Sequence, residues 1–408
     1  MEEDLSSGAC VYVKKGEARS LKAGGPWIYD NEAGRIEGAV RDGDIVAVRD
    51  FDGYFLGWGF YNGKSKIRIR MLARREESRI TPQFFRERIE AAWEYRKAVM
   101  REEDLETSRI IFGEADWLPG ITVDRFGDVL VIESLALGSD RFKEELLSLL
   151  VETMARDGAA VRGIYERSDA KVRELEGLTR TKGFIGPEFD TRVSVTENGI
   201  RYIVDVKDGQ KTGFFLDQKY NRRAVAGLCR GKRVLDCFTH TGSFGLNAAA
   251  AGASYVLSVD ASETAIEQAK ENARLSGLAD KVEYRCADVF ELLPALEQAG
   301  ERFDVVILDP PAFTKSRQAT KNAVRGYREI NLRGMKLLED GGFLATCSCS
   351  HFMEPELFAR TIAEAARGAH RRLRQIESRT QGPDHPYLWG DAQTLYLKFL
   401  LFQVVKER

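Results

Sequence analysis

The stretch over residues 233–251 constrains the fold most, because it runs from a short apolar strand through a turn of small residues into a helix. The composition predicts the turn over residues 239–243 and an alanine-rich helix over residues 246–251. A second strand follows and ends in Asp260, 18 residues after Gly242. This pattern is typical of a βαβ nucleotide-binding unit, in which an acid at that place reaches ribose hydroxyls.

The small number of glycines in this turn indicates which of two kinds of cofactor, a dinucleotide or a ligand without phosphates, the site binds. A dinucleotide site uses G-x-G-x-x-G so that the backbone can approach a pyrophosphate. Here the turn holds only Gly242 and Gly245, and it is preceded by Asp236. Such a loop suits a cationic ligand without phosphates, so we predict S-adenosylmethionine, which carries a sulfonium and an ammonium group. The structural alternative is an ordinary doubly wound fold that merely needs a tight turn.

Length and composition limit the class of protein. A chain of 408 residues exceeds the ~250 to 300 beyond which single cores split, so two or three domains are expected. The net charge is only −2, which means that any nucleic-acid surface must come from local clusters of basic residues. No apolar run approaches the ~18 residues of a membrane span, and we expect a cytoplasmic protein. The six cysteines do not have the spacing of a disulfide framework or a metal site.

We predict three domains, over residues 1–76, 77–191 and 192–408. Short alternating strands and Asp-Gly and Asn-Gly turns make the first one β-rich. Helical spacing over residues 81–101 opens the second, which continues with a hairpin over residues 120–133 and shows no catalytic constellation.

A basic segment closes the first predicted domain. Between residues 64 and 75 there are six basic residues and no acid. Strict alternation predicts that Ile67, Ile69 and Met71 face the core. The opposite face would then carry the phosphate-binding side chains of Lys66, Arg68 and Arg70. A charged edge strand that protects the sheet from aggregation is the alternative.

Acids recur at the ends of the strands that follow Asp260. Strands are predicted over residues 282–286 and 303–308, and Asp288 and Asp309 follow them. Open α/β sheets bind ligands at the carboxyl ends of their strands, so we expect Asp288 to hold adenine. Residues 315–336 contain seven basic residues and one acid, and we predict that this segment contacts RNA through Lys315, Arg325 and Arg328.

Two cysteines end the next strand, predicted over residues 341–350. Carbon 5 of cytosine becomes a nucleophile when a thiolate adds to carbon 6 and an acid stabilises the ring nitrogen. Cys347 or Cys349 could supply the thiolate, and Asp309 at the neighbouring strand could supply the acid. Burial of both cysteines as small hydrophobic residues is the alternative.

Several motifs resemble those of the RlmI-type class I methyltransferases, which act on cytosine carbon 5 in large-subunit (23S) ribosomal RNA. They lie at residues 113–120, 211–218, 309–316, 326–331 and 346–351. The resemblance covers nearly the whole chain. It implies an N-terminal PUA RNA-binding domain, a central α/β domain and a C-terminal Rossmann-like domain with a mixed seven-stranded sheet. It also implies S-adenosylmethionine as cofactor, large-subunit ribosomal RNA as partner, and pairing of two copies of the chain.

The resemblance assigns roles to individual residues. It implies a cysteine nucleophile, for which Cys349 is favoured over Cys347. It implies cofactor contacts by nine residues: Gln210, Phe215, Asp236, Phe238, Thr241, Gly242, Asp260, Asp288 and Asp309. Many RNA cytosine methyltransferases carry a second cysteine after the Asp-Pro motif, but this chain has Ala312 and Phe313 there. We therefore hypothesise that Cys347 or a water molecule helps to remove the carbon-5 proton.

Two further functions stay open at this point. Asp-Pro-Pro followed by an aromatic residue also suits methylation of a base nitrogen, such as formation of 7-methylguanine, in which no cysteine is needed. An RNA-binding ribosome-assembly factor with a vestigial cofactor site is the other. The acids Asp236, Asp260, Asp288 and Asp309 argue against the assembly factor, because a binding module for an anionic partner has no use for them.

Overall fold

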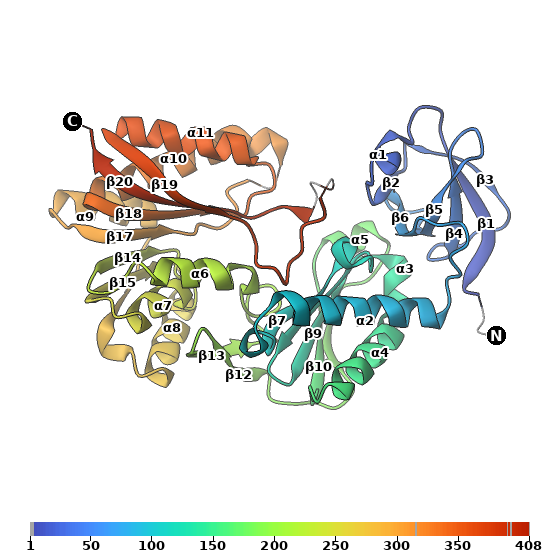
Figure 1. Cartoon of the computed structure of the whole chain (residues 1–408), viewed down its shortest axis with the longest axis horizontal. Helices are drawn as coiled ribbons and strands as arrows, with labels where there is room; N and C mark the ends of the chain where they lie inside the picture. The colour runs from blue at the N-terminus through green and yellow to red at the C-terminus, as the bar shows by residue number, and fades with distance from the viewer. Residues whose placement is uncertain (1–3, 315, 390, 392–393, 408) are drawn as a thin grey trace. The chain divides into compact units, whose positions relative to one another are not determined.

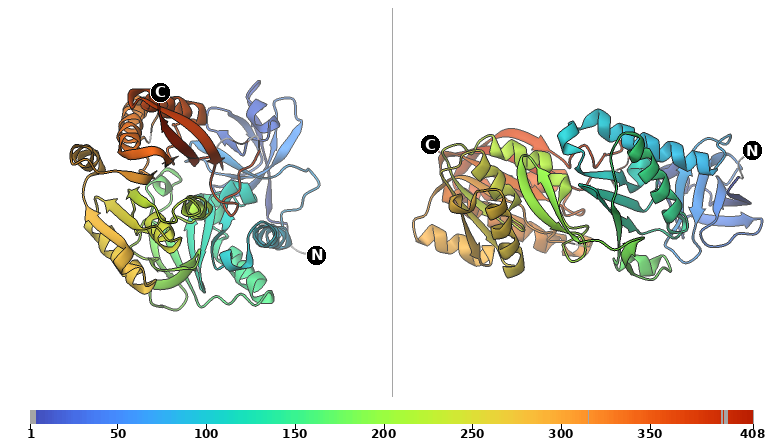
Figure 2. Two further views of the ribbon diagram at one scale, coloured as in Figure 1. Left: turned by 60° about the vertical axis from the view of Figure 1, so that its left-hand side comes forward. Right: turned by 90° about the horizontal axis from the view of Figure 1, so that it is seen from below.

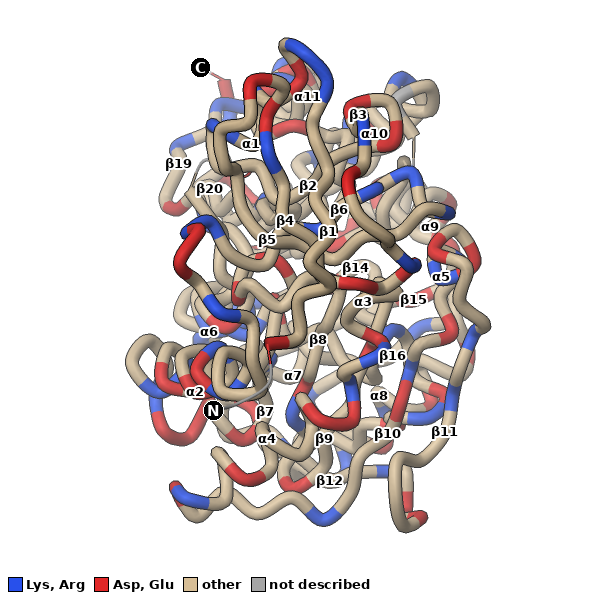
Figure 3. The backbone as a smooth tube through the Cα atoms, turned by 90° about the vertical axis from the view of Figure 1, so that its right-hand side faces the viewer, with Lys and Arg blue, Asp and Glu red and all other residues tan. Residues whose placement is uncertain are grey.

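The computed structural model describes residues 4–314, 316–389, 391 and 394–407, and the chain divides into two compact units (Figure 1). The first unit consists of Met1–Val195, Val204–Leu216 and Pro383–Leu395, and the second of Thr196–Ile203, Asp217–Gly382 and Tyr396–Arg408. The predicted boundary at residue 76 falls inside the first unit, and the division into three domains stays a prediction. Figure 3 shows basic and acidic residues interspersed along the backbone, as the small net charge requires.

The N-terminal part of the first unit is a six-stranded sheet with the order β2-β6-β5-β4-β1-β3. Ile69 and Met71 of its strand β6 lie in the core, as the alternation predicts. The elements are β1 (Ser6–Val13), α1 (Arg19–Lys22), β2 (Trp27–Tyr29), β3 (Ala33–Glu37), β4 (Ile45–Arg49), β5 (Phe55–Tyr61) and β6 (Ile67–Ala73).

The other face of β6 differs from the prediction at Arg70. This side chain is buried rather than solvent-facing, with 8% of the residue exposed. Its guanidinium group lies 3.1 Å from Glu114 and 3.1 Å from Glu176, two acids from the next part of the chain. The alternating pattern marked the face correctly but could not show that a second layer covers it. Lys66 is exposed and Arg68 is half-buried.

A five-stranded sheet with the order β11-β10-β9-β8-β7 forms the rest of the first unit. Helices α2 and α4 pack together and share one core with the sheet. Thr81 caps α2 by accepting a hydrogen bond from the Phe84 amide. The helices are α2 (Pro82–Val99), α3 (Leu137–Asp140), α4 (Lys143–Arg156) and α5 (Val172–Leu175), and the strands are β7 (Thr107–Phe112), β8 (Ile121–Phe126), β9 (Val129–Ser134), β10 (Gly163–Ser168) and β11 (Thr181–Ile185).

The second unit contains the predicted mixed seven-stranded sheet, with the order β16-β15-β14-β17-β18-β20-β19. Strands β14 to β18 are parallel, and β20 is antiparallel to both of its neighbours. The strands are β14 (Arg233–Cys237), β15 (Tyr255–Asp260), β16 (Val282–Cys286), β17 (Phe303–Leu308), β18 (Leu338–Ser348), β19 (Arg371–Arg379) and β20 (Lys398–Lys406). A two-stranded hairpin, β12 (Arg192–Glu197) and β13 (Ile200–Asp205), contributes residues to both units.

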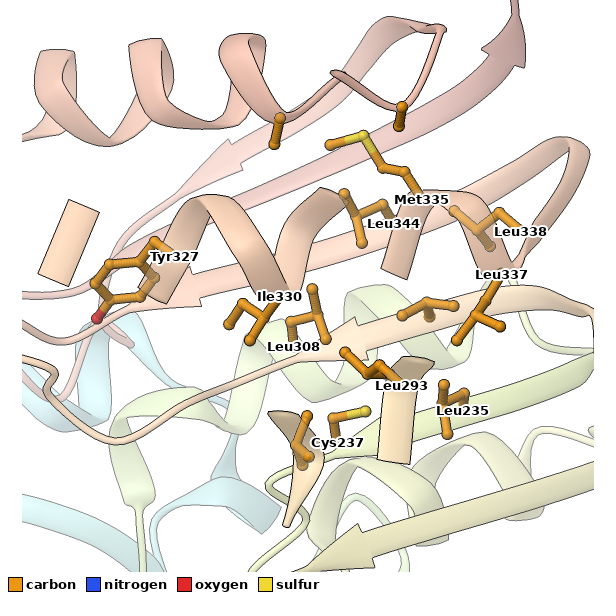
Figure 4. Close-up of a cluster of buried hydrophobic side chains, with 14 of the residues drawn as sticks. Leu235, Cys237, Leu293, Leu308, Tyr327, Ile330, Met335, Leu337, Leu338 and Leu344 are labelled. Atoms are coloured by element: carbon orange, nitrogen blue, oxygen red, sulfur yellow. The ribbon is translucent and has the colours of Figure 1, made fainter. Parts of the chain in front are cut away.

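Helices cover both faces of the seven-stranded sheet (Figures 1 and 2). One face carries α6 (Lys219–Ala226), α7 (Ser243–Ala250) and α8 (Glu263–Leu275), and the other carries α9 (Val289–Gln298), α10 (Thr320–Leu337) and α11 (Pro355–Gly368). Leu235, Leu308 and Leu344 from the strands pack against Leu293 and Ile330 from the second set of helices (Figure 4). Because both faces are covered, the parallel strands are almost continuously apolar and end in polar residues at one edge.

Arg222 of α6 forms a buried ion pair that we expect to be important for stability. Its guanidinium group donates two hydrogen bonds to the Glu197 carboxylate, at 2.7 and 2.8 Å, and the two side chains are 1% and 0% exposed. Arg222→Met would leave the Glu197 charge buried without this partner. We therefore expect a loss of about 3–5 kcal/mol in the free energy of unfolding.

Urea unfolding followed by circular dichroism measures this loss. The exposed Arg325→Met is a matched control, for which we expect a change within about 0.5 kcal/mol. A loss below about 1 kcal/mol in Arg222→Met would show that the pair does not stabilise the fold.

Candidate active site

The turn between β14 and α7 concentrates backbone strain. Within five residues, Phe238, His240 and Gly242 have positive φ values of 64°, 50° and 87°. Such conformations cost about 1–3 kcal/mol each in residues other than glycine, and they gather at ligand sites. Strand β15 holds the turn in place, because Val259 O accepts from Thr239 N at 2.9 Å and the Asp260 carboxylate accepts from His240 N at 2.8 Å.

Asp236 lies beneath this turn and fixes its shape. Its carboxylate is fully buried and accepts hydrogen bonds from Gly245 N at 2.8 Å, Thr239 Oγ1 at 2.5 Å and Ser258 Oγ at 3.3 Å. Burial raises the pKa of Asp236 to about 7, against the effect of these hydrogen bonds. Through these hydrogen bonds, Asp236 joins the turn to the first turn of α7.

The turn also has buried polar atoms that a polar ligand could satisfy. Within the described residues, Asp236 Oδ1, Thr241 Oγ1 and Tyr284 Oη have no hydrogen-bond partner. A Cβ atom placed on Gly242 would lie 3.2 Å from Tyr284 Oη, so this hydroxyl adjoins the turn. A buried polar atom without a partner costs about 1–3 kcal/mol, which a bound cofactor or water would recover. The residues present thus fit a polar cofactor at this turn.

Gly245 tests whether the shape of the turn is needed for cofactor binding. A Cβ atom there would lie 2.1 Å from Ser258 Oγ and 3.0 Å from Asp236 Oδ2, so one of these groups would have to move. We expect Gly245→Ala to weaken S-adenosylmethionine binding at least tenfold and to destabilise the fold by about 1–3 kcal/mol. Titration calorimetry measures the affinity. Gly183→Ala is the control, because nothing lies within 4 Å of the added atom, and unchanged affinity in Gly245→Ala would contradict the expectation.

The predicted acids lie at the carboxyl edge of the parallel strands. Asp260 ends β15 and accepts from Ser262 N at 2.9 Å. Asp288 is exposed and caps α9 by accepting from Phe290 N at 2.7 Å. Asp309 follows β17, the strand that pairs with β14 on the other side of the turn. Since adjacent parallel strands end at one edge, these carboxylates flank the turn over residues 238–242.

The Asp309 carboxyl group is partly protonated at neutral pH. Gln218 Nε2 donates to its Oδ1 at 2.9 Å. Burial raises the pKa of Asp309 to about 7, and the neighbouring Asp217 raises it further in the same direction, while Arg222, Cys347 and Gln218 oppose the shift. A group with this pKa is partly protonated at neutral pH, so it can donate as well as accept a proton.

Cys347 of β18 and Cys349, which follows the strand, differ in accessibility. Strand β18 lies beside β17, with Thr346 opposite Leu308, so both cysteines follow close to Asp309. Cys347 is fully buried, and burial together with Asp309 holds the pKa of its thiol well above the ordinary value. Cys349 lies one residue beyond the end of β18 and is partly exposed. Of the two thiols, Cys349 is the one that a large substrate can reach.

Tyr327 of α10 was missed by the sequence argument. Its hydroxyl lies 3.0 Å from Ser348 Oγ and 3.0 Å from Ser350 Oγ, the two residues on either side of Cys349. Burial raises the pKa of Tyr327 to about 12, so the hydroxyl stays neutral. The motif at residues 326–331 was the signal, but only the packing of α10 against β18 shows what the tyrosine holds. Gln218 was likewise part of a noted motif without a role.

The other predicted site residues belong to the first unit, lie on α10 or fall outside the described residues. Gln210 and Phe215 belong to the first unit, where Gln210 is exposed and Phe215 packs under Lys211. Arg325 and Arg328 are exposed on α10, and Lys315 lies outside the described residues. Within the described part of the chain, no group of histidine, cysteine and acidic residues could hold a metal ion, and no helix is long and apolar enough to cross a membrane.

Family models match two parts of the chain. An S-adenosylmethionine-dependent methyltransferase model matches residues 179–403, and a PUA-like domain model matches residues 11–74. The first match contains the strained turn, the acids at the strand ends, Cys347 and Cys349. It therefore supports the assignment of the seven-stranded sheet to a methyltransferase.

Relatives match the chain over nearly its whole length. A protein of Aeromonas salmonicida named ribosomal RNA large subunit methyltransferase I is 40% identical over 393 residues, which cover 96% of this chain and 98% of the relative. Its namesake in Shewanella denitrificans is 40% identical over 397 residues, or 97% and 99% of the two chains. A methyltransferase solved in complex with SAH has the same fold, with a TM-score of 0.82 at 20% identity over 97% of this chain and 99% of that one.

Proposed function

The chain belongs to the ribosomal RNA large subunit methyltransferase I family of S-adenosylmethionine-dependent enzymes, and from this we propose that it forms 5-methylcytidine in large-subunit ribosomal RNA with Cys349 as nucleophile. One observation carries the choice of cytosine carbon 5. A partly exposed thiol, Cys349, stands at the end of β18 beside the strand that ends in Asp309, a carboxyl group with a pKa of about 7. Methylation of cytosine carbon 5 needs both groups.

The proposed reaction begins with the thiol and the carboxyl group. The Cys349 thiolate forms a bond to carbon 6 as the double bond between carbons 5 and 6 opens. Protonated Asp309 gives its proton to the ring nitrogen, which takes up the displaced electron pair. Carbon 5 is then enamine-like and forms a bond to the methyl group as the bond from that group to its sulfonium sulfur breaks. Loss of the carbon-5 proton and of the bond between the Cys349 sulfur and carbon 6 restores the double bond between carbons 5 and 6 and the free thiolate. The ring nitrogen returns its proton to the Asp309 carboxylate.

When bound, S-adenosylmethionine supplies the electrophilic methyl group for this reaction. We propose that the second unit holds it at the turn over residues 238–242, where Thr241 and Tyr284 offer unpaired hydroxyls and Asp260 offers a carboxylate near the ribose position of the βαβ unit. Gln210 and Phe215 of the first unit stay predicted contacts.

Removal of the carbon-5 proton is better assigned to water than to Cys347. A general base must be unprotonated when it accepts the proton. The Cys347 thiol is fully buried and has a pKa well above the ordinary value, so it keeps its proton at neutral pH. We therefore propose that an ordered water molecule accepts the proton and that Cys347 packs the sheet.

RNA contacts are proposed along α10. Lys321, Arg325 and Arg328 are four and three residues apart, which places them on one face of the helix. All three are exposed, and none has an ion pair within the described residues. Arg333 and Lys336 farther along the helix pair with Glu297 instead. The first half of α10 therefore offers positive charge to a phosphate backbone, and Lys66 of the PUA-like domain stays a second predicted contact.

Methylation of a base nitrogen remains the competing activity, and Phe313 argues against it. In that reaction the aromatic residue after Asp-Pro-Pro would serve as a stacking surface for the base. Here the Phe313 ring packs on protein rings, with centroid distances of 4.7 Å to Tyr327, 5.8 Å to Phe290 and 6.4 Å to Phe238.

Transfer of labelled methyl from S-adenosylmethionine to unmodified large-subunit ribosomal RNA, followed by nucleoside mass analysis, tests the proposal. We expect label in 5-methylcytidine alone. Label in a methylated guanine would favour nitrogen methylation, and absence of both transfer and cofactor binding would favour the assembly factor.

We further propose a cytoplasmic location, where its proposed ribosomal substrate is found. Pairing of two copies of the chain stays a prediction, and light scattering on the purified protein tests it.

A further inference from the structure

Lys398 is the first residue of β20, and it is a buried cation beside the proposed nucleophile. In the antiparallel pair of β18 and β20, Lys398 lies opposite Ser348. Ser348 is the residue that directly precedes Cys349. The Lys398 ammonium group donates to Ser350 O at 2.7 Å and to Tyr396 O at 2.8 Å. The side chain thus passes along the end of β18 and reaches the carbonyl group that directly follows Cys349.

The charge of Lys398 is not neutralised by an acid. Only 7% of the residue is exposed, and within the described residues no carboxylate lies within ion-pair distance of its ammonium group. The acceptors Ser350 O and Tyr396 O are neutral carbonyl groups, and an ammonium group has three N–H donors. A buried charge without a counter-ion is costly, so an anion that forms near this ammonium group would be stabilised by it.

Among the described residues, two ionisable side chains near Cys349 carry no charge at neutral pH, which makes its thiolate a fitting anion for Lys398. Tyr327 and Cys347, which interact electrostatically with Cys349, are both kept neutral by burial. Burial lowers the pKa of Lys398 to about 8, and the Cys349 thiolate acts in the opposite direction by favouring the charged ammonium group. At neutral pH the lysine therefore supplies positive charge at the Ser350 carbonyl group, one residue after the thiol.

We propose that Lys398 is a positioning residue that acts through Cys349: its buried ammonium group stabilises the Cys349 thiolate and so keeps the nucleophile in its reactive form. Lysine next to a thiol lowers the thiol pKa, because the positive charge favours the deprotonated form. The inference rests on the proposed function, in which Cys349 adds to carbon 6. It gives a residue of β20 a role in the reaction. The hydrogen bonds to Ser350 O and Tyr396 O, taken alone, would give Lys398 only the structural role of holding the strand ends together.

Alkylation of Cys349 by iodoacetamide at a series of pH values tests the proposal without RNA or cofactor. Mass spectrometry of the Cys349 peptide separates this thiol from the exposed Cys286, which is the internal reference. In the wild type we expect the Cys349 thiol to titrate below the ordinary value of about 8.5. Lys398→Gln keeps a hydrogen-bond donor but loses the charge. In this variant we expect the midpoint of the curve of Cys349 alkylation rate against pH to rise by at least about one pH unit. This lowers the thiolate fraction at pH 7 about tenfold.

Lys398→Arg is the matched variant that retains the charge, and we expect it to restore most of the shift. A purely structural role would lower the melting temperature of Lys398→Gln but leave the titration of Cys349 unchanged, which would overturn the proposal. If Lys398→Gln does not fold, the titration of Cys349 in the wild type still tests the proposal. A Cys349 pKa of about 9 or above in the wild type would contradict a stabilised thiolate.

Methylation by Cys349→Ala distinguishes failure of the proposed function from failure of this inference. Methylation that survives Cys349→Ala removes the proposed nucleophile, whatever the titration shows. An unshifted titration together with an inactive Cys349→Ala removes only the role of Lys398.

Discussion

Cys349→Ala is expected to form no 5-methylcytidine above background, a loss of more than about 1,000-fold in the rate of methyl transfer. Without the thiol, carbon 5 of cytosine is too weak a nucleophile to take the methyl group. The exposed thiol of Cys286 at the same edge ends β16, which three strands separate from β18. Nucleoside mass analysis of the reacted ribosomal RNA measures the product.

Two further cysteine variants make this result specific. Cys286→Ala removes an exposed thiol at the end of β16 and should leave the rate unchanged. Cys347→Ala removes the buried thiol beside Asp309 and should destabilise the fold but leave 5-methylcytidine as the product. Methylation that persists in Cys349→Ala and stops in Cys347→Ala would reverse the assignment of the nucleophile.

Asp309→Asn has the second largest expected effect, a loss of about 100- to 10,000-fold in kcat. The amide keeps the size of the side chain but has no proton to give to the ring nitrogen. Since the pKa of Asp309 is about 7 and the reaction also needs the Cys349 thiolate, the wild-type rate should fall tenfold per pH unit above the higher of these two pKa values, where Asp309 loses its proton and no more thiolate is gained. A pH–rate profile measures both effects, and this alkaline fall should be absent from Asp309→Asn.

The same substitution should increase stability at alkaline pH. An aspartate in the unfolded chain has a pKa of about 3.9, so folding raises the pKa of Asp309 and favours its protonated form. The folded state therefore loses stability relative to the unfolded state as the pH rises from about 4 to about 7. We expect Asp309→Asn to melt above the wild type at pH 8 and close to it at pH 4. A lower melting temperature at pH 8 would show that the buried carboxylate stabilises the fold.

The seven-stranded sheet was predictable because its signals are local or motif-based. Apolar strands that end in Asp260, Asp288 and Asp309 alternate with helices, and this pattern alone places the acids at one edge of a parallel sheet. The helix predicted over residues 81–101 and the hairpin predicted over residues 120–133 correspond to α2 and to the pair of β8 and β9, and their signals are local in the same way.

The remainder depends on contacts between residues far apart in the chain. Alternation in β6 could not show that Glu114 and Glu176 cover Arg70 and bury it. The spacing of Cys347 and Cys349 places both on one strand but says nothing of the buried position of the first and the partly exposed position of the second. Lys398 lies 49 residues beyond Cys349 and carries no motif, so only the pairing of β18 with β20 brings its charge to the site.

A covalent complex with RNA tests the central claim most directly. RNA that carries 5-fluorocytidine at the methylated position has no removable proton on carbon 5, so the bond between Cys349 and carbon 6 should persist after methyl transfer. The account predicts a complex of protein and RNA that survives denaturation, requires S-adenosylmethionine, and maps to the Cys349 peptide by mass spectrometry. If the enzyme methylates unmodified RNA but forms no such complex, or forms it equally well in Cys349→Ala, Cys349 is not the nucleophile.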